Sequence, residues 1–248
     1  MTHYSVVIPF RDRGIDPLRM ANLQRVQRHW MPYAPVVIIG DGRQGNEQFN
    51  RCAAYNRGVA SCPDAEVFVF AESDMLVDRA QVDDAIGLAA RSPGLVVPFT
   101  EYRYLSEDDS RDVRNGLSPR GIEPESVIPN EQRSWPRTGP LNVLSRRTLD
   151  MVGGWDEQFE GNWWDDRAMK RAFDVAVGPT RFVTGPAYHL YHLPGWTGAH
   201  LSAEDRAAAE RNRHRFMLYQ QATTPQQIRQ LTSGEGVISG GTRQGSNP

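Results

Sequence analysis

The sequence predicts an α/β fold with a mostly parallel central sheet, flanked by helices and completed by a C-terminal helix. Apolar, β-branched runs of strand length alternate with segments of helical periodicity over the first hundred residues. The apolar runs end in polar or glycine-containing loops, as buried parallel strands do. The chain has 248 residues, and we assign residues 1–222 to a single domain of this kind.

The first hundred residues contain seven expected elements. They are strands at 5–10, 35–39, 66–71 and 94–99, with helices at 18–29, 48–60 and 82–90 between them. Ligands of doubly wound sheets bind at the carboxyl ends of the strands. The acidic loops at Asp12, Asp41 and Asp74 should therefore gather along one edge of the sheet.

The second half of the chain is less regular. Residues 106–137 are rich in charge and proline with little periodicity, so we expect a flexible loop or lid there. The further expected elements are ordered structure at 138–149, a short helix at 167–173, a strand at 181–193 and a helix at 202–219 with Ser202 as its N-cap. Residues 223–248 form a C-terminal tail, and its Gly/Ser-rich part, 233–248, is expected to be disordered.

Composition excludes several classes of protein. The formal net charge of −2 gives no general attraction for nucleic acid or anionic membranes. No apolar run approaches the roughly 18 residues of a membrane span, and the first ten residues lack the layout of a signal peptide. We therefore expect a cytoplasmic protein without stable membrane insertion. Cys52 and Cys62 are not spaced as metal ligands, so two free thiols are expected.

A candidate metal site follows the strand at 66–71. Glu72, Ser73 and Asp74 stand directly at its end, where a carboxylate can reach a divalent ion. Carboxylate oxygen with imidazole suits Mn²⁺ or Mg²⁺, and His189 and His192 are the candidate imidazoles. On an extended strand, residues three apart point to opposite faces, so only one of the two is expected to bind the metal. A helix cap or a solvated turn is the simpler interpretation of the acidic residues.

A second candidate site combines tryptophans with adjacent carboxylates. Trp163 and Trp164 directly precede Asp165 and Asp166, and Trp155 lies just upstream. Indole rings stack on sugars, and a partly desolvated carboxylate can take a proton from a hydroxyl. In a helix the two acids diverge by about 100°, so one can act as base while the other binds a hydroxyl. Core tryptophans and ordinary acids of a helix N-terminus are the alternative.

Taken together, these segments resemble the GT-A glycosyltransferases, especially family-2-like enzymes and the C-terminal segment of galactosyltransferases. The resemblance covers roughly residues 4–195, with a gap at 106–137. The matching segments are SVVIPFR at 5–11, Asp41, RCAAYNRG at 51–58, ESD at 72–74 in place of the usual D-x-D, GGWDE at 153–157, WWDD at 163–166 and YHLYH at 188–192.

The resemblance implies a role for each matching position. A nucleotide-sugar half spans residues 1–100 and an acceptor and metal half spans 138–200. The implied donor-binding residues are Pro9, Arg11, Arg13, Asp41, Asn56, Glu72 and Ser73. The implied metal ligands are Asp74 and His192, with His189 as the fallback. The implied acceptor-binding residues are Trp155, Trp163 and Trp164. The implied catalytic acids are Asp166, as general base, and Asp165, which would hold the acceptor.

The activity implied is metal-dependent, inverting transfer of a sugar from a nucleotide sugar, UDP-linked by analogy, to an acceptor hydroxyl. The cofactor would be Mn²⁺ or Mg²⁺, and the acceptor a glycan, a protein or another hydroxyl compound. Three alternatives stay open: a retaining enzyme of the same fold, a non-catalytic nucleotide- or sugar-binding module, and a nucleotidyltransferase. The last would normally carry a Gly/Arg/Lys-rich phosphate loop, for which residues 11–14 are too short a match.

Overall fold

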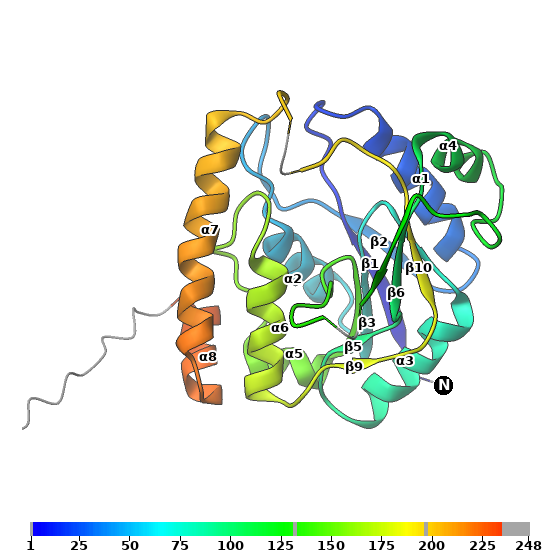
Figure 1. The fold of residues 1–248 in the computed structure, drawn as a ribbon. Coiled ribbons are helices and arrows are strands. Elements are labelled where there is room, and N and C mark those ends of the chain that lie inside the picture. Colours follow the sequence, from blue (N-terminus) through cyan, green and yellow to red (C-terminus); the bar gives the residue numbers. More distant parts are fainter. Residues whose placement is uncertain (1, 131–132, 196–197, 235–248) are drawn as a thin grey trace, which may run out of the picture.

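A six-stranded sheet forms the centre of the computed structural model, which describes residues 2–130, 133–195 and 198–234 (Figure 1). Its strand order is β2-β1-β3-β8-β5-β9. The strands are β1 (Tyr4–Pro9), β2 (Val36–Ile39), β3 (Val67–Ala71), β5 (Val96–Val97), β8 (Leu141–Ser145) and β9 (Arg181–Phe182). Only β8 runs against the other five. The prediction of a mostly parallel sheet is confirmed.

Three helices of the first half lie close to their predicted positions. They are α1 (Leu18–Trp30), α2 (Arg51–Ser61) and α3 (Arg79–Arg91). Helix α2 packs on β1 and β2 and approaches β1 closely at Gly58. A Cβ at Gly58 would lie 2.4 Å from Cγ1 of Val7, so this approach requires glycine.

A second, four-stranded sheet has the order β4-β10-β6-β7, which the sequence did not predict. Its strands are β4 (Met75–Val77), β6 (Glu101–Tyr104), β7 (Ser126–Pro129) and β10 (Pro186–His189). The single strand expected at 181–193 is wrong, because it divides between the two sheets as β9 and β10. In the second sheet His189 pairs with Met75, one residue after Asp74. This pairing joins the end of β3 to the histidine segment.

Two segments expected to lack regular structure contain ordered elements. Helix α4 (Glu107–Arg114) and strand β7 lie within residues 106–137, and α8 (Pro225–Thr232) lies within the tail. α4 is capped by Ser106, whose side chain accepts a hydrogen bond from Asp109 N. Residues 235–248, most of the stretch expected to be disordered, lie outside the described residues.

The C-terminal helices cover one side of the molecule. α5 (Arg146–Val152), α6 (Asp165–Ala176) and α7 (Ala203–Gln221) are the elements concerned, and α6 and α7 run side by side (Figure 1). Ser202 caps α7 as predicted and forms a reciprocal capping box with Asp205. None of the helices in the described ranges is long and apolar enough to cross a bilayer.

Asp156 connects the loop that precedes α6 to helix α7 through hydrogen bonds. Its side chain is fully buried and accepts hydrogen bonds from Nε of Arg215 at 2.5 Å and from the Tyr219 hydroxyl at 2.7 Å. The neighbouring Trp155 is only 5% exposed and packs against Tyr55 and Phe70 in the core. The GGWDE segment therefore stabilises the fold, and the expectation that Trp155 binds the acceptor is wrong.

Replacing Asp156 with alanine is expected to lower the free energy of unfolding by about 3 kcal/mol, because the largely buried guanidinium of Arg215 would lose its carboxylate partner and Tyr219 its hydrogen-bond acceptor. Urea denaturation followed by circular dichroism measures this loss. Asp150→Ala, at an exposed position of α5, is the matched control. Equal free energies of unfolding for the two variants would show that the hydrogen bonds of Asp156 contribute little to stability.

Candidate active site

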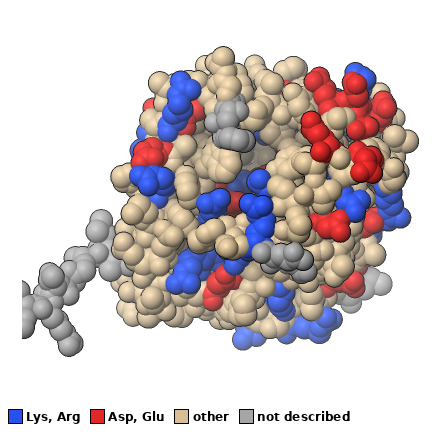
Figure 2. Space-filling view, viewed as in Figure 1, with Lys and Arg blue, Asp and Glu red and all other residues tan. Residues whose placement is uncertain are grey.

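One cavity of about 560 Å³ opens at the carboxyl ends of the central strands. It is lined by residues from both halves of the chain. Of the three acidic strand-end positions expected at this edge, Asp74 lines the cavity, whereas Asp12 and Asp41 do not. Figure 2 shows a hollow on this face with basic side chains at its margin and acidic atoms within it. The predicted site residues that line the cavity are Pro9, Glu72, Ser73, Asp74, Trp163, Asp165, Asp166, His189 and His192.

Asp74, His189 and His192 form a cluster suited to a metal ion, with one ligand atom of each within 4.8 Å of the others. Nε2 of His192 lies 3.1 Å from Oδ2 of Asp74, and Nε2 of His189 lies 4.0 Å from Oδ1. Oδ1 is buried without a hydrogen-bond partner. An orphaned carboxylate oxygen beside two imidazoles fits a divalent ion of the Mn²⁺ type.

The structure brings both histidines to this cluster, so the expectation that only one could take part is wrong. That expectation assumed a continuous strand, in which residues three apart face opposite sides. Strand β10 ends at His189, and the chain then leaves the sheet, so strand alternation does not extend to His192. The two rings lie 4.9 Å apart, centroid to centroid.

Backbone hydrogen bonds fix the segment that carries His192. Leu190 N donates to the Asp74 carbonyl at 2.9 Å, and Tyr191 N donates to Oγ of Ser110 at 2.8 Å. Asp16, buried before α1, accepts from Leu193 N at 2.7 Å and also from Leu18 N at 2.9 Å. The carboxylate of Asp16 thus ties the histidine segment to the start of α1.

Burial and the Asp74 carboxylate shift the pKa values of the two imidazoles in opposite directions. Burial lowers the pKa of His189 to about 4, so this ring is neutral at pH 7. Burial also opposes the charge of His192, but the adjacent Asp74 carboxylate outweighs it and raises the pKa of His192. Nδ1 of His192 lies 2.7 Å from the Leu193 carbonyl, and donation to that oxygen directs Nε2 toward Asp74.

Asp16→Ala is expected to weaken Mn²⁺ binding by about 10- to 100-fold, because partners that orient a metal ligand contribute on this scale. Isothermal titration calorimetry with MnCl₂ measures the affinity. Asp12→Ala, in the same loop, is the control, because its side chain contacts only Gly14 N among the interactions of the described residues. Unchanged Mn²⁺ affinity in Asp16→Ala would contradict the orienting role of this carboxylate.

Opposite the histidines, Arg51 holds two of the acidic residues of the cavity. Its guanidinium pairs with Asp165 at 2.7 Å and with Glu72. Asp166, beside this pair, forms no ion pair with a side chain in the described parts of the chain and accepts from Arg167 N at 2.8 Å. Burial, and next the charge of Asp165, raises the pKa of Asp166. A carboxylate with a raised pKa in a cavity can act as a general base.

Two tryptophans before α6 have an unusual backbone. Trp163 and Trp164 have φ of 77° and 74°, and among the described residues they alone are non-glycine residues with positive φ. Trp163 is 37% exposed and lines the cavity. Trp164 does not line it; its ring stacks on Phe216, and Arg167 lies over it. Of the three tryptophans expected to contact the acceptor, only Trp163 reaches the cavity.

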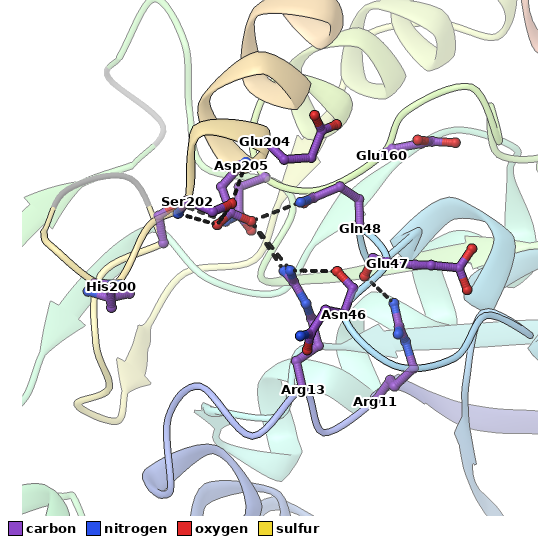
Figure 3. A network of polar contacts seen from close by, with 12 residues as sticks. Arg11, Arg13, Asn46, Glu47, Gln48, Glu160, His200, Ser202, Glu204 and Asp205 are labelled. Atoms are coloured by element: carbon purple, nitrogen blue, oxygen red, sulfur yellow. Dashed lines mark hydrogen bonds and ion pairs between the residues drawn. The ribbon is translucent and has the colours of Figure 1, made fainter.

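Three expected donor-binding residues, Arg11, Arg13 and Asp41, form contacts within the protein beside the cavity, and Figure 3 shows those of Arg11 and Arg13. Arg11 pairs with Asp41 and donates to the carbonyls of Gly45 and Glu47. Arg13 pairs with Asp205 at the start of α7. None of the side chains of Arg11, Arg13 and Asp41 lines the cavity. In the structure these three side chains are engaged in contacts within the protein, and their contact with the donor stays a prediction.

Asn56 is also structural. Its side chain accepts from Trp155 N at 2.9 Å and donates to the Trp155 carbonyl and to Glu157, each at 2.8 Å. It therefore holds the GGWDE segment against α2 and lies outside the cavity. The RCAAYNRG segment contributes Arg51 to the site instead of Asn56.

The sequence analysis missed several residues that line the cavity. Besides Arg51, they are Arg19, Tyr102, Tyr104, Asn162, Arg137 and Tyr191. Arg19 lies in the first turn of α1, and the two tyrosines belong to the unpredicted strand β6. None of the three follows a strand end that the sequence predicts. Arg137 closes the segment expected to be a loop. No pattern in the local sequence distinguishes these residues from other arginines, tyrosines and asparagines of the chain.

The fold was compared with solved structures. Drosophila beta-1,4-galactosyltransferase 7, solved with manganese, UDP-galactose and xylobiose, superimposes with a TM-score of 0.54 at 13% identity, over 84% of this chain and 79% of that one. The chain has the GT-A fold. Glucosyl-3-phosphoglycerate synthase from Mycobacterium tuberculosis gives a TM-score of 0.49 at 15% identity, over 88% of this chain and 79% of that one. The GT-A assignment rests on structure, since no protein-family model and no curated protein matches the sequence.

Proposed function

We propose that this protein is a metal-dependent glycosyltransferase that moves a sugar from a nucleotide sugar, UDP-linked, to an acceptor hydroxyl with inversion of configuration. One observation carries the proposal: a single cavity of a GT-A fold brings the Asp74, His189 and His192 cluster together with the carboxylate of Asp166. The metal cluster suits a metal-bound diphosphate, and the Asp166 carboxylate suits activation of a hydroxyl. The proposed inverting transfer uses both.

The residues of the cavity divide into two functions. Asp74, His189 and His192 would hold Mn²⁺ or Mg²⁺, which supplies Lewis-acid stabilisation of the departing diphosphate. Asp166 takes the proton of the acceptor hydroxyl while its oxygen bonds to the anomeric carbon and the bond from that carbon to phosphate breaks. Arg51 fixes Asp165, whose remaining oxygen can hold the acceptor, and Trp163 offers an indole face to the sugar.

Transfer assays with a panel of UDP-sugars and MnCl₂ test this function. UDP release without acceptor measures donor activation, and xylobiose, which the Drosophila structure holds, serves as a first acceptor. EDTA should abolish UDP release. Failure of every nucleotide sugar to bind or react in the presence of Mn²⁺ would refute the proposal and leave a binding module of another specificity.

The configuration of the product tests the inverting part separately. NMR of the anomeric proton should show a configuration opposite to that of the donor. Retention would assign the protein to the retaining enzymes of the same fold, in which Asp166 would not act as the base. The metal cluster and the donor chemistry would stand in that case.

A further inference from the structure

Two arginines in the cavity lie next to the metal cluster and have no full counter-charge. They are Arg137, at the end of the segment before β8, and Arg19, in the first turn of α1. The arginines expected to bind the donor, Arg11 and Arg13, are instead paired with Asp41 and Asp205. Arg19 and Arg137 are therefore the candidates for contact with an anion at this cluster.

The position of Arg137 is fixed from two sides. Buried Asn130 accepts from Arg137 N at 2.6 Å and donates to its carbonyl at 2.9 Å. The guanidinium lies over the rings of Tyr102 and Tyr104, 5.3 and 5.7 Å from their centroids. Both rings contact His189. Arg137 and His189 thus contact the same two tyrosine rings and line the same cavity.

The charge of Arg137 is not compensated by the described residues. No carboxylate among them pairs with its side chain, and its Nε is buried without a hydrogen-bond partner. Arg51, in the same cavity, is paired with both Glu72 and Asp165. A guanidinium that is held in place, borders a cavity and lacks an anion is suited to bind one supplied by a ligand.

Arg19 approaches the cluster from the other side. Its NH1 lies 3.9 Å from Oδ2 of Asp74, and its side chain is 40% exposed. A divalent cation bound to Asp74 would lie close to this guanidinium, and the two positive groups would repel each other. An anion between them would compensate this repulsion. Two arginines and a cation around one carboxylate leave an excess of positive charge. A multiply charged anion would balance it.

We infer that Arg19 and Arg137 position the diphosphate of a nucleoside diphosphate at the metal cluster, an inference that rests on the proposed function. The opposite side of the cavity carries Asp165 and Asp166, whose charges would repel an acidic acceptor. The anion therefore belongs to the donor. Two guanidiniums flanking the metal cluster match the two linked phosphates of UDP.

Binding of UDP and of uridine to the full chain, measured by calorimetry in EDTA and again with MnCl₂, tests the inference. Arg137→Ala and Arg19→Ala should each weaken UDP binding by about 10- to 100-fold, the range for a charge-assisted hydrogen bond, in both buffers. Uridine affinity should stay unchanged, since uridine has no phosphate. Arg137→Lys should keep part of the UDP affinity, because it retains the charge but loses the planar fork.

Arg147→Ala, at an exposed position of α5, is the control and should bind UDP as the wild type does. Thermal melting identifies any variant that fails to fold, and Arg137→Lys then decides the role of Arg137. Unchanged UDP affinity, or an equal loss for UDP and uridine, would overturn this inference alone. A wild type that binds neither compound, with or without MnCl₂, would overturn the proposed function as well.

Discussion

Asp166→Asn is expected to slow sugar transfer by about 10²- to 10⁴-fold, the usual contribution of a general base, while UDP binding stays at the wild-type level. Asparagine has nearly the same shape as aspartate but cannot accept the proton of the acceptor hydroxyl. Single-turnover transfer rates and calorimetry of UDP binding measure the two effects separately. Asp150→Asn, an exposed carboxylate outside the cavity, serves as the control.

The pH dependence of transfer gives an independent check on Asp166. Burial and the charge of Asp165 raise its pKa, so the basic form is lost at a higher pH than for an ordinary aspartate. Activity should accordingly decline as the pH falls through this raised pKa and reach a plateau above it. Asp166→Asn should remove this acidic limb from its residual activity. A variant with wild-type turnover and the same pH profile would show that another group is the base.

Asp74→Asn is expected to have the second large effect, a loss of Mn²⁺ binding together with loss of transfer. Asp74 is the only carboxylate of the metal cluster, and its buried Oδ1 has no other partner. An amide in its place presents a neutral oxygen, a much weaker ligand for a hard cation. Electron paramagnetic resonance of added Mn²⁺ reports the free ion and so measures the loss directly.

Removing the metal from the wild type should reproduce the effect of Asp74→Asn on activity. EDTA should stop UDP release, and MnCl₂ in excess should restore it in the wild type but not in Asp74→Asn. Asp112→Asn, on the exposed side of α4, controls for the change in net charge. Full activity of the wild type in EDTA would contradict a metal-dependent reaction at this cluster.

Sequence patterns predicted the positions that follow directly from strand and helix periodicity. The apolar runs at β1, β2 and β3 fixed the parallel part of the sheet, and Asp74 entered the site because it follows β3. Asp165 and Asp166 were predicted because they directly follow Trp163 and Trp164 in a segment that resembles a known motif, and α6 does begin there. In each case the local sequence decides where the backbone goes and therefore where the side chain lies.

The rest of the site depends on contacts between distant segments, which local patterns do not contain. Arg11 and Arg137 have the same side chain, but Arg11 meets Asp41 across a loop, whereas no described carboxylate pairs with Arg137. Two tryptophans of similar sequence context likewise separate, Trp155 into the core and Trp163 into the cavity. Pairing of residues remote in the sequence decides between the structural and the functional role.

The left-handed backbone of Trp163 and Trp164 lowers the stability of the fold beside the cavity. A bulky residue in this conformation costs about 1–3 kcal/mol, so two in succession are maintained only because the surroundings over-determine them. They stand immediately before Asp165 and Asp166 and set the direction in which α6 begins. Laboratory selection for thermal stability alone would favour glycine or asparagine at Trp163, whose side chain is partly exposed, but not at Trp164, whose ring packs on Phe216. A function of the cavity that uses the Trp163 indole would oppose that change.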